Sequence, residues 1–135
     1  MALSTDASPT EVRELIRAYY EGLFPKSCPH CGRGYATLRE YVAATTPVGR
    51  YISYDVDVGD FAPERPAGTF AFANCACGNT LALSTEGLPR ETRLALLAWV
   101  RAEAARQGLP ATQFIDWLRK TVRDDALGQT APPPA

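Results

Sequence analysis

The sequence predicts an α+β domain in which an N-terminal helix, a small antiparallel sheet and a C-terminal pair of helices pack together. Apolar residues recur at helical spacing near both ends, apolar and polar residues alternate in the middle, and glycine and proline separate these segments. A chain of 135 residues can bury an apolar core. We therefore expect one domain over 1–128, followed by a disordered, proline-rich tail over 129–135.

The first helix is expected over 8–24. Ser8 can cap it, Pro9 suits the first helical position, and Glu11 stands where a capping box needs an acidic residue. Gly22 and Pro25 mark its end. One apolar stripe follows at helical spacing, formed by Val12, Leu15, Ile16, Tyr19 and Leu23.

The middle of the chain predicts strands in an antiparallel meander. The clearest strand covers 51–58, where every second residue is apolar, and a weaker candidate covers 35–44. Phe70 and Phe72 indicate a further strand, and Leu81 and Leu83 a last short one. The stretch 59–68 contains two prolines and is expected to be a loop.

The C-terminal part predicts a helical hairpin over 89–127. Its first helix should end at Gly108, Pro110 should open the second, and Gly128 should end that one. The apolar positions suited to cover the sheet include Leu94, Leu97, Phe114 and Leu118.

Two close pairs of cysteines are the strongest chemical signal. The first pair lies in the segment Cys28-Pro29-His30-Cys31-Gly32, and the second in Cys75-Ala76-Cys77-Gly78. Four thiolates suit a structural Zn²⁺, and each trailing glycine allows the positive φ angle that such a turn requires. We therefore expect Cys28, Cys31, Cys75 and Cys77 to bind one zinc ion. Iron in the same shell, buried free thiols and redox disulfides are the alternatives, and His30 could replace one cysteine as a ligand.

These turns resemble those of the zinc-ribbon and zinc-knuckle proteins over about residues 28–84, through Cys28, Cys31, Gly32, Cys75, Cys77 and Gly78. The resemblance implies a zinc ion held between two cysteine turns joined by β-hairpins, and a role in transcription, translation or protein assembly. The second turn has the spacing Cys-x-Cys where Cys-x-x-Cys is usual. The shorter turn also counts against rubredoxin-like iron electron carriers, whose two turns both have the longer spacing.

The remaining composition favours a binding module over an enzyme. The formal charge is −1, and neither a nucleophile elbow nor a phosphate-binding glycine loop is present in the sequence. Neither a secretory signal nor an apolar run of membrane-spanning length is recognisable. We expect a cytoplasmic zinc-binding adaptor or regulator whose partner is a macromolecule, most simply a protein, with no membrane association.

An alternative function is sequence-specific DNA binding. The segment 104–123 resembles a helix-turn-helix, with Gly108 in the turn and Phe114 as an apolar contact. In that interpretation the second helix would present Thr112, Gln113, Asp116, Arg119, Lys120 and Arg123 to DNA. The long first helix and the weak net charge favour a plain helical hairpin instead.

Overall fold

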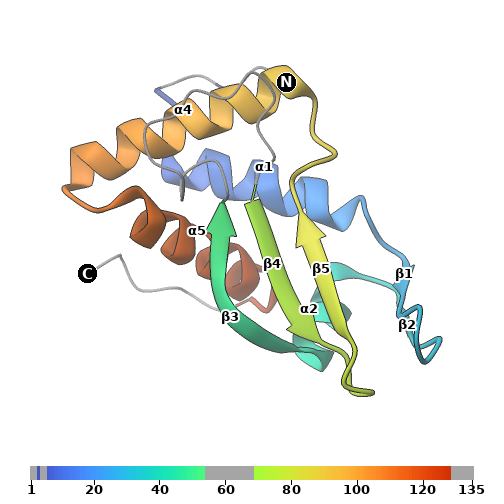
Figure 1. Cartoon of the computed structure of the whole chain (residues 1–135). Coiled ribbons are helices and arrows are strands. Elements are labelled where there is room, and N and C mark those ends of the chain that lie inside the picture. The colour runs from blue at the N-terminus through green and yellow to red at the C-terminus, as the bar shows by residue number, and fades with distance from the viewer. Residues whose placement is uncertain (1–2, 4–5, 54–68, 129–135) are drawn as a thin grey trace.

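The computed structural model describes residue 3 and residues 6–53 and 69–128, and within them it is an α+β fold (Figure 1). The helices are α1 (Pro9–Glu21), α2 (Leu38–Ala44), α4 (Arg90–Gln107) and α5 (Ala111–Ala126). The strands are β1 (Lys26–Ser27), β2 (Gly34–Tyr35), β3 (Thr46–Ser53), β4 (Thr69–Asn74) and β5 (Thr80–Ser84).

The described strands form two separate antiparallel sheets. β1 pairs with β2, and β3, β4 and β5 form a three-stranded meander in that order. Val48 pairs with Phe72, and the β3–β4 register shifts between Val48 and Ile52. An antiparallel meander is present, as predicted, but α2 replaces its first predicted strand and separates it from the β1–β2 hairpin.

The helices close one side of the meander. α5 packs against β3, and α1 and α4 pack against α5. Figure 1 shows α1 and α5 behind the three-stranded sheet. The largest buried side chains between these layers include Trp99, Phe114, Ile16 and Leu118. Arg13 of α1 also forms a double hydrogen bond with the carboxylate of Asp125 in α5, with a shortest contact of 2.7 Å.

The ends of the helices follow the sequence signals. The Ser8 hydroxyl accepts from the Glu11 amide, and the Glu11 carboxylate accepts from the Ser8 amide, which confirms the capping box. The helix starts at Pro9, as expected, and ends at Glu21. Gly108 has φ +70° and ends α4, while Pro110 immediately precedes α5.

One secondary-structure prediction is wrong. Residues 35–44 are not a strand, because α2 occupies 38–44. The Thr37 hydroxyl accepts from the Glu40 amide, and the Glu40 carboxylate accepts from the Ala36 amide, so the first turn of α2 is capped from both sides. The predicted strand over 51–58 is seen only as the end of β3, since 54–58, like the predicted loop over 59–68 and the tail over 129–135, lies outside the described residues.

Candidate metal centre

The cysteine pairs lie in two tight turns. Cys28 follows β1 directly, and its amide donates to the Arg33 carbonyl across the hairpin at 2.9 Å. Cys75 follows β4, and its amide donates to the Asn79 carbonyl at 2.8 Å. Gly32 and Gly78 have φ angles of +78° and +93°, the left-handed conformation expected after each pair.

The structure brings the four predicted cysteines together. Their sulfur atoms all lie within 4.8 Å of one another, with 3.8 Å between Cys28 and Cys77 and 3.7 Å between Cys31 and Cys75. A tetrahedron with Zn–S bonds of about 2.3 Å has sulfur atoms about 3.8 Å apart. The spacing is too long for a disulfide, and all four thiols are free. The arrangement therefore suggests a bound metal ion.

The site is half embedded in the domain. Cys28 and Cys75 are buried, whereas Cys31 and Cys77 are exposed. The hydroxyl of Tyr35, itself buried, donates to the sulfur of Cys75 at 2.9 Å, and the Asn79 side-chain amide lies 3.6 Å from the sulfur of Cys28. Such donors orient metal ligands and stabilise their negative charge.

Hydrogen bonds from backbone amides and from Tyr35 lower the pKa values of the two buried thiols. The backbone amide of Cys31 lowers the pKa of Cys28 to about 6 despite its burial. The Tyr35 hydroxyl lowers the pKa of Cys75, and the same contact raises the pKa of Tyr35 to about 12. The buried half of the site is therefore prepared to carry thiolate charge.

The exposed thiol of Cys77 behaves differently. The backbone amide of Asn79 lowers the pKa of Cys77, but loss of solvation and the three neighbouring sulfur atoms outweigh it and raise the pKa to about 11. Four sulfur atoms this close repel one another when all are ionised, so full ionisation requires a cation among them. The electrostatics thus agree with the geometry.

His30 does not take part in this cluster. It lies in the first turn but is exposed, and the four cysteines alone form the group of potential ligands in the described part of the chain. Tyr35 and Asn79 contact the sulfur atoms, and the spacing of the cysteines could not reveal these contacts. They reach the sulfur atoms only because the two turns meet in three dimensions.

The residues considered for DNA contact are scattered by the fold. Gln113 is exposed and Thr112 half-buried, while the amine of Lys120 forms an ion pair with Asp116 at 3.0 Å. Arg119 is only 2% exposed, so it is not on the surface that DNA would contact. Its position on α5 turns it toward the core, which corrects that part of the interpretation.

Arg123 is half-buried, and its Nη2 atom donates to the Val42 carbonyl at 3.1 Å. Of the three basic residues suggested for DNA contact, only Lys120 is exposed. These three residues therefore offer little free positive charge to a phosphate backbone.

Comparison with known proteins finds no matching protein family, no similar curated protein and no similar solved structure. Within residues 6–53 and 69–128, no helix is both long and apolar enough to cross a membrane.

Proposed function

We propose that the protein is a zinc-stabilised adaptor or regulator, in which Cys28, Cys31, Cys75 and Cys77 hold one structural Zn²⁺. The observation that carries this proposal is the convergence of four sulfur atoms, all within 4.8 Å of one another, from two turns that are distant in the sequence. An ion at this position joins the β1–β2 hairpin to the β4–β5 turn. Neither sheet has more than three strands in the described residues, so such a cross-link adds stability that the strands alone lack.

The chemistry of the site favours a structural role over a catalytic one. Four cysteine ligands complete the preferred coordination of zinc and leave no position for a substrate or an activated water. His30, an alternative ligand from the sequence alone, does not belong to the group of potential metal ligands in the described residues. Iron would accept the same four sulfur atoms, and metal content and colour distinguish the two ions.

Metal analysis of the purified protein and its variants tests this proposal. We expect about one zinc per chain in the wild type, and loss of zinc together with loss of fold in Cys28→Ser and Cys75→Ser. Ser27→Ala is the matched control, because Ser27 is exposed and adjacent to the first ligand. A Cys28→Ser protein that keeps the wild-type circular dichroism and melting temperature without metal contradicts the structural role.

The partner in this proposal is another protein. Its support is the weak net charge, which argues against a nucleic-acid partner. Val48 on edge strand β3 is 40% exposed and is the one large apolar side chain exposed in the described residues, so it is the apolar position chosen for the test. We expect a partner protein to co-purify with the tagged chain from its native host. The substitution Val48→Glu should weaken the binding of this partner. Recovery of nucleic acid instead, with binding that falls steeply as salt rises, favours the DNA-binding alternative.

A further inference from the structure

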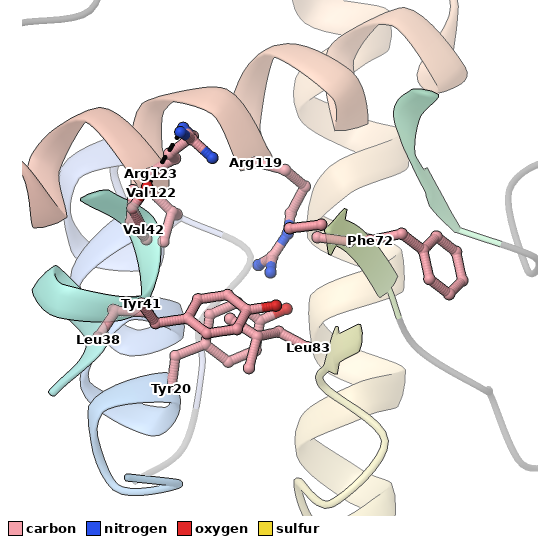
Figure 2. A pocket seen from close by; sticks show the side chains of 11 residues that line it. Tyr20, Leu38, Tyr41, Val42, Phe72, Leu83, Arg119, Val122 and Arg123 are labelled. Carbon is pink, nitrogen blue, oxygen red and sulfur yellow. Dashed lines mark hydrogen bonds between the residues drawn. The ribbon is translucent and has the colours of Figure 1, made fainter. Parts of the chain in front are cut away.

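A second site lies between the helices and the meander (Figure 2). The space that a water-sized sphere can enter measures about 40 Å³ and is partly open to solvent. That is room for a few water molecules or for one small polar group. Its walls come from α1, α2, β4, β5 and α5, and are formed by Tyr20, Leu38, Tyr41, Val42, Ala71, Phe72, Ala73, Leu83, Arg119, Val122 and Arg123.

Arg119 is the unusual feature of this pocket. Its side chain is 2% exposed, and its Nε and Nη1 atoms have no hydrogen-bond partner in the described part of the chain. Figure 2 shows it reaching from α5 toward Tyr20 and Tyr41, and the guanidinium carbon lies 4.4 Å from the centre of the Tyr20 ring. This cation–π contact leaves the Nε and Nη1 donors without a hydrogen-bond partner in the described residues.

The guanidinium keeps its charge in this environment. Burial lowers the pKa of Arg119 to about 9, so the side chain is still protonated at neutral pH. A buried positive charge without a counter-ion is strongly unfavourable, and proteins ordinarily pair such a group. None of the 11 lining residues is acidic, so these walls supply no counter-ion.

A second polar atom in the pocket is also unused. The Tyr20 hydroxyl is buried and has no hydrogen-bond partner in the described residues. It belongs to the same side chain whose ring contacts the guanidinium. The pocket thus combines one buried cation and one free hydroxyl donor with apolar walls that include Leu38, Phe72 and Val122.

We propose that this pocket binds the carboxylate of a small organic acid that has a short apolar tail. A carboxylate is planar, carries a single charge and accepts a charge-assisted hydrogen bond from a guanidinium N–H, and Arg119 has such donors without a partner at Nε and Nη1 in the described residues. A phosphate dianion is more strongly hydrated and needs more donors than these walls provide. The space of about 40 Å³ holds the carboxylate alone, so the hydrocarbon tail is expected to lie over the apolar wall residues at the open side. This proposal is independent of the metal and of the adaptor function.

Isothermal titration with hexanoate tests the proposal, with hexanamide as the uncharged probe of the same shape. Hexanoate should bind the zinc-loaded protein and raise its melting temperature, whereas hexanamide should do neither. Arg119→Met keeps the length of the side chain and removes the charge, and it should abolish binding. Tyr20→Phe keeps the ring under the guanidinium and should weaken hexanoate about tenfold, the effect of losing one hydrogen bond to a charged acceptor. Lys120→Ala, an exposed neighbour on α5, should bind as the wild type does.

The outcomes separate the sources of the carboxylate. Binding of hexanoate alone indicates a free organic acid, and binding of an N-acetylated peptide with a free C-terminal leucine, but not of its amidated form, indicates a chain terminus. The proposal is overturned if hexanoate and hexanamide bind equally well. It is also overturned if neither hexanoate nor the peptide with a free C-terminus binds. If Arg119→Met fails to fold, Tyr20→Phe still tests the proposal. An unchanged hexanoate affinity in Tyr20→Phe would contradict a hydrogen bond from the Tyr20 hydroxyl to the carboxylate.

Discussion

Replacing Tyr35 with phenylalanine isolates one contact of the metal centre. Tyr35 is 1% exposed, and its hydroxyl donates to the sulfur of Cys75 at 2.9 Å. Phenylalanine fills the same space without the oxygen, so the change removes a hydrogen bond and creates almost no cavity. A hydrogen bond to a charged acceptor contributes about 2 kcal/mol, and Tyr35→Phe should therefore raise the unfolding equilibrium constant about 30-fold.

The metal should be held less tightly as well. Loss of a group that orients a ligand typically lowers metal affinity about 10- to 100-fold, so a chelator should remove zinc from Tyr35→Phe at correspondingly lower concentration. Urea denaturation of the zinc-loaded protein and a chelator competition measure the two effects separately.

Tyr20→Phe is the matched control for this experiment. Tyr20 is equally buried, but its hydroxyl has no hydrogen-bond partner in the described residues, so its removal should leave stability unchanged or slightly raised. If Tyr35→Phe behaves like Tyr20→Phe in both denaturation and chelator competition, the reasoning about the hydrogen bond to Cys75 is refuted.

Three further predictions concern the fold. Phe114 is fully buried, so Phe114→Ala should destabilise the protein by about 3–5 kcal/mol in urea denaturation, and a loss below about 1 kcal/mol would contradict its place in the core. Gly78 has φ +93°, so Gly78→Ala should lower the free energy of unfolding by about 1–2 kcal/mol and weaken zinc retention. An unchanged free energy of unfolding would contradict the need for glycine in this turn. Burial alone would raise the pKa of Glu103, but hydrogen bonds from Arg106 and Gln107 outweigh it and lower the pKa. The wild type should therefore be more stable than Glu103→Gln at pH values above 4.5, the ordinary pKa of a glutamate, and this advantage should decline as the pH falls below 4.5. A stability difference that grows as the pH falls would contradict the lowered pKa.

The helices near the chain ends were predictable because their signals are local. Ser8 and Glu11 form a capping box whichever elements pack nearby, and Gly108 adopts the positive φ angle that ends α4. The convergence of the cysteines was predictable for a related reason. Each glycine-ended pair has the spacing of a metal-binding turn, and the proposed ion would need both pairs.

The helix α2 was missed because two kinds of signal compete in it. Tyr41 and Val42 favour a strand by propensity, whereas Thr37 and Glu40 form the capping contacts of a helix start. The capping contacts and the burial of Leu38 against the rest of the domain prevail. The Thr-x-x-Glu spacing was the signal that could have found this helix.

The pocket around Arg119 could not be read from the sequence. Its lining residues come from five elements, and only tertiary packing brings them together. Arg119 comes directly after the buried Leu118 in α5. Its charge suggested a position on the surface of the helix, and nothing in the sequence indicated that it was buried. The burial of that charge depends on Tyr20, which approaches from α1.

X-ray absorption at the zinc edge of the purified protein tests the central claim most directly. We expect four sulfur neighbours at about 2.3 Å, one shell of a single element, and no nitrogen or oxygen ligand. A zinc shell containing nitrogen or oxygen, or a protein that folds with no metal bound, would contradict the assignment of Cys28, Cys31, Cys75 and Cys77 as the four ligands.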